Sequence, residues 1–440
     1  MSVPLSAAFT TLGCKVNQYE TQAILDRFEA AGFRIVPFES AADVYVINTC
    51  SVTSVAESKS RYTIRRATRH NPNAKVVVTG CAAQMSLNKS ESMAGADVVV
   101  PNPEKLETLD YLFRAYPEWA SHVEANPHTE PRDLPARTRA TLKVQDGCSV
   151  YCSYCSIPYT RPKMVSRPVT AVLDEARRMA DQGFREAILT GVLIGSYGPE
   201  TGSEGPDFPQ LVERIARESG LGRLRISSIE MQQVTPRLVE LVRAGLVVPH
   251  FHIPLQSGDS TVLRDMNRPY DQDDYLRLCD WLKAEIPDLT LTTDIMVGFP
   301  TETDERFESS IHVCERAEYL KVHAFTFSPR FGTPADAFGD PVPPAEKQRR
   351  RQALIEVSAR TATAHQARFL GRTMRVLVEG KVSQDGRLEG LTDNYLSVKF
   401  AGPRSLVHEF CWVRLDDCRD GALTGELMPG PVNDVLRVLA

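Results

Sequence analysis

Residues 141–161 read Thr-Leu-Lys-Val-Gln-Asp-Gly-Cys-Ser-Val-Tyr-Cys-Ser-Tyr-Cys-Ser-Ile-Pro-Tyr-Thr-Arg, and this stretch decides the expected architecture. An apolar run predicts a strand, and Cys148, Cys152 and Cys155 follow it with the spacing Cys-x3-Cys-x2-Cys. Cysteine thiolate is the usual ligand of iron–sulfur clusters, so these side chains can hold three irons of a 4Fe–4S cube. The fourth iron has no cysteine and can bind a small chelating ligand. We therefore expect a catalytic cluster with one open iron.

Two other interpretations of the triplet are weaker. Zinc prefers four ligands, often in paired Cys-x2-Cys units, and no fourth Cys or His stands close by in the sequence. A disulfide would require an oxidising compartment, which nothing in the sequence suggests. Zinc remains the main alternative to the iron–sulfur cluster.

The composition is that of an ordinary globular protein with several domains. The chain has 440 residues, of which 42% are hydrophobic and 24% charged, enough for two or three domains. No apolar run approaches the ~20 residues of a membrane span. Residues 1–8 lack the charged and apolar segments of a signal peptide. We expect a cytoplasmic protein with reduced thiols and no membrane association.

The charge is unevenly distributed. A net charge of −5 argues against a generally basic DNA-binding protein. However, residues 58–90 contain no acidic side chain, and residues 347–375 contain Glu356 as their only acid. Such local basic faces suit an RNA substrate. The alternative is that each run is merely the solvated face of a helix.

The first 100 residues predict alternating strands and helices. The expected strands lie near 8–11, 44–47, 76–78 and 98–100, and the helices span 17–31 and 56–70. Cys14, Cys50 and Cys81 each stand just beyond the C-terminal end of a different strand. In an open α/β sheet these ends meet at one edge, where ligands bind. This arrangement favours a second three-thiolate cluster, whereas a lone cysteine is usually a buried small hydrophobe.

Residues 101–137 predict a helix followed by an irregular, proline-containing linker. Six strand–helix repeats follow, with strands at about 141–146, 184–190, 224–229, 250–255, 289–297 and 321–327. This alternation predicts a parallel sheet with right-handed crossovers, as in a partial eight-fold barrel that is open on one side. Residues just beyond each strand are candidate ligand contacts, although simple turn chemistry is the better explanation for the glycines and prolines. They are Thr190, Gly191, Ser227, Ser228, Glu230, 256–258, 298–300 and 328–330.

From Met374 onward the pattern changes to short alternating apolar segments separated by glycine turns. It predicts a small antiparallel β-barrel of the OB-like kind, which often binds oligonucleotides. The expected domains are 1–137, 138–370 and 371–440, and the fold class is α/β. The remaining cysteines, which we interpret as structural, are Cys279, Cys314, Cys411 and Cys418.

The motifs together resemble one known family. Cys-x3-Cys-x-aromatic-Cys, with Tyr154 as the aromatic residue, is the signature of radical S-adenosylmethionine (SAM) enzymes. The whole chain is similar to the methylthiotransferases within that superfamily, which carry a TRAM barrel at the C-terminus. The segments that carry the resemblance are Thr-Leu-Gly-Cys-Lys-Val-Asn (11–17), Val-Ile-Asn-Thr-Cys-Ser-Val-Thr (46–53), Val-Thr-Gly-Cys-Ala (78–82), His-Ile-Pro-Leu-Gln-Ser-Gly (252–258) and Asp-Ile-Met-Val-Gly-Phe-Pro (294–300).

The resemblance implies two 4Fe–4S clusters. Cys148, Cys152 and Cys155 would ligate the radical cluster, and the other three cysteines an auxiliary cluster that takes part in sulfur donation. Two S-adenosylmethionine molecules would be used per turnover, one for a methyl group and one for a 5′-deoxyadenosyl radical. The residues that the resemblance implies as S-adenosylmethionine contacts are Tyr154, Thr190, Gly191, Glu230, Gln256 and Phe299.

The family has three branches. The segments 48–61 and 189–198 look most like the branch that modifies N6-threonylcarbamoyladenosine at position 37 of tRNA. The alternatives are isopentenyladenosine in tRNA and an aspartate of a ribosomal protein, and a non-catalytic iron–sulfur RNA-binding protein is a third. The resemblance further implies the anticodon loop as partner and a flavodoxin- or ferredoxin-type electron donor. We expect a monomer.

Overall fold

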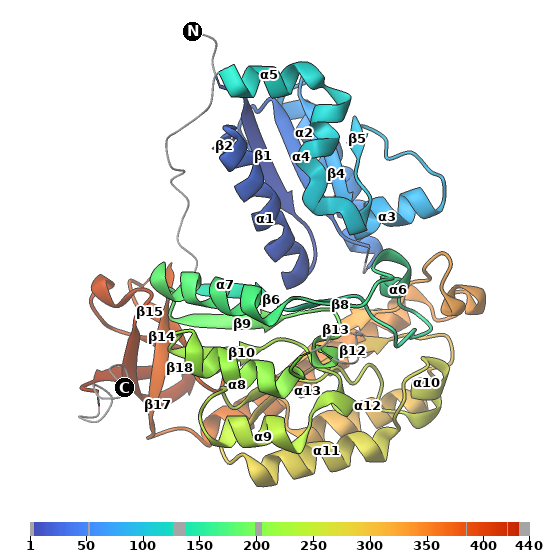
Figure 1. Cartoon of the computed structure of the whole chain (residues 1–440). Coiled ribbons are helices and arrows are strands. Elements are labelled where there is room, and N and C mark those ends of the chain that lie inside the picture. Colours follow the sequence, from blue (N-terminus) through green and yellow to red (C-terminus); the bar gives the residue numbers. More distant parts are fainter. Residues whose placement is uncertain are drawn as a thin grey trace. The chain divides into compact units, whose positions relative to one another are not determined.

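The computed structural model describes residues 4–51, 53–125, 138–198, 205–383, 385–419 and 421–430. The chain packs into two compact units (Figure 1). Unit 1 comprises Met1–Pro135, Gly147–Tyr151 and Cys155–Met164, and unit 2 comprises Ala136–Asp146, Cys152–Tyr154 and Val165–Ala440. The predicted linker lies outside the described residues from position 126 to 137.

Unit 1 contains a parallel five-stranded sheet in the order β2-β1-β3-β4-β5. The strands are β1 (Ser6–Thr11), β2 (Arg34–Val36), β3 (Val44–Thr49), β4 (Lys75–Gly80) and β5 (Val98–Val99). Four of them confirm predicted strands. The sequence did not predict β2, since three residues on a sheet edge carry too little alternation to be recognised.

Helices cover both faces of this sheet (Figure 1). They are α1 (Lys15–Ala31), α2 (Ser54–His70), α3 (Cys81–Asn88), η1 (Asn102–Glu107), α4 (Thr108–Ala115) and α5 (Pro117–Ala125). The short helix α6 (Ile157–Thr160) packs against α3. Successive side chains of a strand point to opposite faces, so Val44 and Val46 pack with α1, α4 and α5. Tyr45 and Ile47 pack with α2 and α3 on the other face. The carboxyl ends of the strands are left for the loops that carry Cys14, Cys50 and Cys81.

Unit 2 contains the six predicted parallel strands. They are β6 (Arg139–Lys143), β9 (Glu186–Thr190), β10 (Arg223–Ile226), β11 (His250–His252), β12 (Thr290–Val297) and β13 (Lys321–Thr326). Three form the sheet β10-β9-β6 and three form β11-β12-β13. A parallel bridge between Ser228 and His252 joins the two sheets into one partial barrel.

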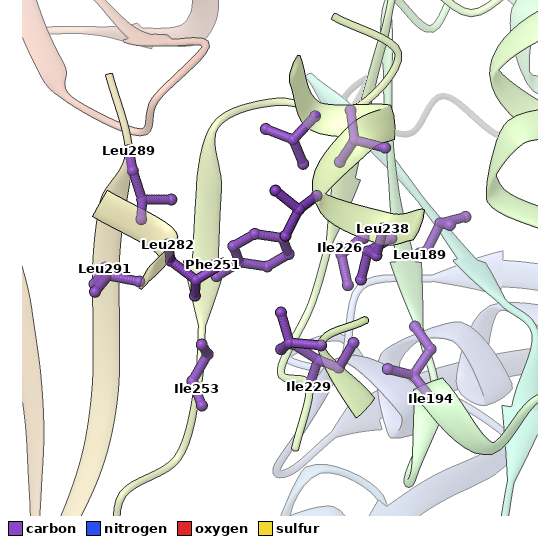
Figure 2. Close-up of a cluster of buried hydrophobic side chains, with 14 of the residues drawn as sticks. Leu189, Ile194, Ile226, Ile229, Leu238, Phe251, Ile253, Leu282, Leu289 and Leu291 are labelled. Carbon is purple, nitrogen blue, oxygen red and sulfur yellow. The ribbon is translucent and has the colours of Figure 1, made fainter. Parts of the chain in front are cut away.

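The elements between these strands are mainly helices. They are α7 (Val169–Asp181), η2 (Ile194–Ser196), α8 (Phe208–Glu218), η4 (Met231–Gln233), α9 (Pro236–Arg243), α10 (Ser260–Asp265), α11 (Gln272–Glu285), α12 (Asp304–Ala317), η5 (Pro334–Phe338) and α13 (Pro344–Ala367), with the hairpin pair β7 (Gln145–Asp146) and β8 (Val165–Ser166). Figure 2 shows side chains from these strands and helices pointing toward one another, with the Phe251 ring of β11 among them. This apolar layer lies between the strands and the helices, because every second strand residue points to it.

The other face of the same strands is polar. Its buried or half-buried side chains are Glu186, Thr190, Arg223, Arg225, His250, His252, Thr292, Asp294 and His323. Buried polar groups need partners, and these residues bond to one another: Glu186 with Arg225 at 3.0 Å, and His252 with Thr292 at 2.9 Å. The inside of the partial barrel can therefore hold a polar ligand.

The C-terminal barrel closes with the strand order β14-β15-β16-β18-β17. Its elements are β14 (Thr373–Val382), β15 (Leu388–Thr392), β16 (Ser397–Phe400), η6 (Arg404–Leu406), β17 (Phe410–Arg419) and β18 (Ala422–Met428). The predicted small barrel is confirmed. It is not wholly antiparallel, because β16 and β18 pair in parallel to close it.

Within unit 2, the small barrel packs against the amino ends of the six strands. Ion pairs join Arg139 to Glu379 at 2.7 Å, Arg223 to Asp393 at 2.9 Å and Arg372 to Asp288 at 2.7 Å. Parallel strands gather their carboxyl ends at the opposite end. The barrel and the candidate ligand loops thus occupy opposite ends of the strands.

Candidate functional site

The sheet register brings Cys14, Cys50 and Cys81 to one edge of unit 1. Thr49 pairs with Gly80 across β3 and β4, so Cys50 and Cys81 each stand one residue beyond a matched pair. Neighbouring strands lie about 4.8 Å apart. On the other side of β3, Thr11 pairs with Asn48, and Cys14 follows Thr11 by three residues. The predicted convergence of the three strand ends is confirmed.

Gly13 brings the first cysteine loop against the second. A Cβ atom at Gly13 would lie 2.7 Å from the Cys50 Sγ, and Gly13 has a φ of 98°. Only glycine fits this approach and this backbone conformation. The Asn17 side chain donates to the carbonyls of Leu12 and Thr49 at 2.9 and 3.0 Å, which ties the two loops together.

The described thiols are not arranged around a single metal ion. Among the described residues, no three His, Cys, Asp or Glu side chains are arranged to hold one metal ion. A single ion draws all its ligands to one point, whereas a cube binds each thiolate to its own iron and spreads them apart. Cys14, Cys50 and Cys81 are free thiols that follow neighbouring strand ends, and Gly13 leaves no room for a side chain beside Cys50.

A buried charge network lies beside these loops. Lys105 donates to a Glu20 carboxylate oxygen at 2.6 Å, and Arg161 binds both oxygens of Glu20 at 2.8 and 2.9 Å. All three side chains are buried. Burial lowers the pKa of Lys105, while Glu20 and the nearby Cys81 act to raise it. The network places two cations within electrostatic range of the cysteine edge.

The Cys-x3-Cys-x2-Cys loop is divided between the units. Cys148 and Cys155 belong to unit 1, and Cys152 belongs to unit 2. In unit 2, Ser153 accepts from the Ala335 amide at 2.8 Å and donates to the carbonyls of Met266 and Asp265 at 2.9 and 2.7 Å. These bonds fix the backbone on which Cys152 stands.

Arg268 is the functional candidate that the sequence did not reveal. Its Nη1 donates to the Cys152 Sγ at 3.2 Å, and the guanidinium also binds the Glu230 carboxylate and the Tyr270 hydroxyl. Burial alone would lower the pKa of Arg268, but Tyr270, Tyr154, Glu230 and Cys152 outweigh it and raise the pKa well above its usual value. Arg268 is therefore always a cation, and it joins Cys152 to Glu230.

The other predicted contacts have distinct surroundings. Tyr154 packs on a buried apolar cluster that contains Phe299, whose own ring is completely buried against Phe327. Gln256 has a φ of 71° and bridges to β12. Thr190 is buried at the end of β9, and Gly191 is held close to the Gln145 side chain. The structure thus brings Tyr154 together with Phe299, and Glu230 together with Cys152.

Comparisons with known proteins agree with this arrangement. Residues 6–101 match the uncharacterized protein family UPF0004, residues 142–314 the radical SAM superfamily and residues 367–428 the TRAM domain. A threonylcarbamoyladenosine tRNA methylthiotransferase MtaB of Bacillus subtilis is 37% identical over 93% of each chain.

The chain belongs to the methylthiotransferase family of radical SAM enzymes. Other members are an MtaB of Chlamydia pneumoniae, 35% identical over 95% of this chain and 97% of the relative, and a tRNA-2-methylthio-N(6)-dimethylallyladenosine synthase of Geobacillus thermodenitrificans, 32% identical over 95% and 82%. The radical SAM methyltransferase TsrM of Kitasatospora setae shares the fold, with a TM-score of 0.51 at 14% identity over 76% of this chain and 77% of that one. This radical SAM methylthiotransferase is thus a transferase, not a non-catalytic binding protein.

Several cations of the second basic run pair with acids from elsewhere in the chain. In this radical SAM methylthiotransferase, Lys347 pairs with Asp340, Arg350 with Glu302, and Arg360 with Glu315. Further pairs join Arg349 to Asp304, Arg372 to Asp288 and Arg375 to Asp393. These pairs reduce the charge that the run offers to RNA, and its contact with RNA stays a prediction.

The first basic run differs. Lys59, Arg61, Arg65 and Arg69 of α2 are exposed, and the arginines recur every fourth residue along one helix face. Within the described part of the chain, Arg61 pairs with Glu57, while Arg65 and Arg69 have no carboxylate partner. We call Arg61, Arg65 and Arg69 the α2 arginine stripe.

The four remaining cysteines are distinct from the cluster candidates. Burial raises the pKa of Cys279 and of Cys314 to about 12, and that of Cys411 to about 11. Cys418 donates to the Gln366 side chain at 3.2 Å. These thiols stay protonated at neutral pH and are poor metal ligands, since the thiolate is the ligating form. All ten cysteines of the chain are free of disulfide bonds.

In the described ranges, no helix combines the length and the apolarity that crossing a membrane requires.

Proposed function

We propose that the chain converts N6-threonylcarbamoyladenosine at position 37 of tRNA to its 2-methylthio derivative. The observation that carries this proposal is the pattern of identity. Four full-length relatives named for threonylcarbamoyladenosine are 37%, 35%, 35% and 33% identical. Four named for dimethylallyladenosine are 32%, 32%, 32% and 30% identical.

In this proposal Cys148, Cys152 and Cys155 hold the radical cluster, and the three cysteines at the sheet edge of unit 1 hold an auxiliary cluster. Bound there, the two clusters supply the electron that cleaves the sulfonium of S-adenosylmethionine and the sulfur that is transferred. The Gly13 backbone packs directly against the Cys50 thiol, where no larger side chain would fit. This close packing supports the auxiliary cluster, because it holds the first cysteine loop beside the second.

The chain's own residues prepare the site. Arg268 donates a hydrogen bond to the Cys152 sulfur, which stabilises negative charge on that atom. It also fixes the Glu230 carboxylate, which can accept hydrogen bonds from the methionine amine. The other proposed contacts are Tyr154, Thr190, Gly191, Gln256 and Phe299, of which Phe299 backs Tyr154 from within an apolar cluster that excludes water.

A radical is required because the C2 hydrogen of an adenine has no acidity that a side chain could use at neutral pH. Two S-adenosylmethionine molecules per product provide the methyl group and the hydrogen-abstracting radical separately. The remaining partners of the proposal are a sulfur source and an electron donor of the flavodoxin or ferredoxin type.

The proposed RNA contacts are the C-terminal barrel and the α2 arginine stripe. Exposed arginines at four-residue intervals attract phosphates. The barrel matches the TRAM domain. We propose a monomer with domains 1–137, 138–370 and 371–440. These bounds agree in order with the three matched segments and with the barrel, which starts at Thr373.

The test is mass spectrometry of tRNA nucleosides from cells with and without the gene. Loss of 2-methylthio-threonylcarbamoyladenosine with accumulation of its precursor is expected. Complementation with Cys152→Ala should fail with no 5′-deoxyadenosine formed in vitro, whereas Cys50→Ala should form 5′-deoxyadenosine but no methylthio product. If only the methylthio-isopentenyl nucleoside is lost, the enzyme belongs to the branch that modifies isopentenyladenosine in tRNA. If neither nucleoside changes, the tRNA assignment fails, and the ribosomal aspartate becomes the substrate to examine.

A further inference from the structure

Two tyrosines of the cysteine loop lie exposed in unit 1, and the chemistry proposed above does not use them. Tyr151 exposes 51% of its surface and Tyr159 exposes 38%. Their rings form an edge-to-face pair with centroids 6.3 Å apart and an interplanar angle of 79°. In such a pair each ring covers at most one face of the other, so flat aromatic surface stays open to a ligand.

The backbone of Tyr151 is in the left-handed region, with a φ of 52°. A side chain with a Cβ atom disfavours this conformation, and glycine or asparagine would adopt it more readily. This conformation is strained for an aromatic residue, and strained residues concentrate at binding and catalytic sites.

The turn that carries Tyr159 is held firmly. Asn88 donates to the Tyr159 carbonyl at 3.2 Å, and Asn102 donates to the Thr160 carbonyl at 2.8 Å. The next residue, Arg161, is bound to Glu20. The side chains of Asn88, Asn102 and Glu20 thus fix residues 159–161 at the end of α6. A ligand that stacks on this surface meets a preorganised site and orders little protein on binding.

The charge around the pair indicates the class of ligand. The two loop segments of unit 1, 147–151 and 155–164, contain no Asp or Glu, whereas Lys163 is exposed four residues beyond Tyr159. Proteins bind unpaired bases of nucleic acids by combining exposed aromatic rings with cations. A base inside a duplex is stacked on both faces and offers none to a side chain.

We propose that Tyr151 and Tyr159 form a stacking surface for an unpaired nucleobase of the RNA substrate. This inference rests on the proposed function, because it takes RNA as the substrate. Tyr151 immediately precedes Cys152 in the chain, so a base stacked here is held next to the loop of the radical cysteines. The two tyrosines are binding residues for the loop of the RNA and not groups that react.

The test is the affinity of the full-length, cluster-reconstituted enzyme for a fluorescently labelled anticodon stem-loop RNA, measured by anisotropy. Tyr151→Gly relieves the backbone and removes the ring, and Tyr151→Phe keeps the ring and removes the hydroxyl. Tyr151→Gly should weaken binding about 5- to 150-fold, the range for loss of one base–aromatic stack. Tyr151→Phe should stay within about 2-fold of the wild type. Iron content and circular dichroism report whether each variant is folded.

Wild-type affinity in Tyr151→Gly would overturn the inference, and so would an equal loss in Tyr151→Phe, because a hydroxyl contact would then explain it. If Tyr151→Gly loses its iron, Tyr159→Leu decides: weaker RNA binding at full iron content supports the stacking surface, and unchanged binding overturns it. A wild-type enzyme that does not bind the stem-loop at all would instead overturn the proposed function, and the stacking surface with it.

Discussion

Arg161 and Glu20 form a bidentate ion pair in the interior of unit 1, with nitrogen–oxygen distances of 2.9 and 2.8 Å. Arg161 stands six residues after Cys155, and Glu20 stands six residues after Cys14. The pair therefore joins the segments that follow one cysteine of each proposed cluster. Both side chains expose only 3% of their area.

Breaking this pair should destabilise unit 1 strongly. Glu20→Gln leaves the buried cations Arg161 and Lys105 without their carboxylate, which costs about 3–5 kcal/mol, whereas Arg161→Met should cost less because Glu20 keeps Lys105. Urea unfolding should show this order for the single variants, and the double variant should lose less than the sum. Arg217→Ala is the control, because its pair with Glu213 is exposed and contributes under ~0.5 kcal/mol. Additive losses in the double variant would contradict the coupling.

A methyl group at Gly13 should block the auxiliary cluster. The added Cβ would lie 2.7 Å from the Cys50 Sγ. Iron per reconstituted chain should fall from about eight atoms to about four for Gly13→Ala, since each cube holds four irons. Gly245→Ala is the matched control: Gly245 also has a positive φ, 72°, but nothing lies within 4 Å of its added Cβ. Full iron content in Gly13→Ala would refute the assignment.

The stability of unit 2 should fall between neutral and mildly acidic pH. Burial lowers the pKa of His365 to about 4, so the folded chain keeps this imidazole neutral where the unfolded chain protonates it, below about pH 6.5. The stabilisation is complete above that value and is lost as pH falls toward 4. Between pH 7 and pH 5 His365 should account for about 2 kcal/mol.

His365→Gln is the informative variant for this pH dependence. His365 bonds the Thr290 hydroxyl at 2.9 Å, and glutamine can keep a hydrogen bond there without titrating. Urea unfolding at the two pH values should give a flatter profile than the wild type. If the unfolding free energies of the variant and the wild type fall in parallel with pH, titratable groups other than His365 cause the loss of stability.

The contact between the small barrel and the six strands depends on Glu186. This carboxylate is completely buried and binds both Arg223 and Arg225, and Arg223 in turn binds Asp393 of the barrel. Glu186→Gln should cost about 3–5 kcal/mol in unfolding free energy. The control is Glu409→Gln at the same contact, whose exposed pair with Arg185 contributes at most ~1 kcal/mol. Equal losses of unfolding free energy for both substitutions would show that burial does not determine how much each ion pair contributes.

The α2 arginine stripe should contribute a salt-dependent part of RNA affinity. Replacing Arg65 and Arg69 by glutamine removes two phosphate contacts, and the slope of log affinity against log salt should decrease by about 1.5. Anisotropy titrations of labelled tRNA across a range of KCl measure this slope. Arg360→Gln is the control, since Arg360 is exposed but paired with Glu315. An unchanged slope would exclude the stripe from the interface.

Much of the architecture follows from local patterns in the sequence. The six strands, the small barrel and the convergence of Cys14, Cys50 and Cys81 were predictable, because each depends on periodicity or on a strand end. Arg268 was not, since 116 residues separate it from Cys152 and no spacing connects them. The acids that pair with the basic run of α13 were not predictable for a related reason: a sequence displays its cations but not the acids that folding brings to them.

The position of the small barrel sets a minimum size for any molecule that touches both ends of unit 2. The barrel occupies the amino ends of the strands, whereas Cys152, Glu230 and Gln256 follow the carboxyl ends. The 8 residues of β12 alone cover about 26 Å. A free nucleoside or a short oligonucleotide is too small to contact both ends of unit 2 at once.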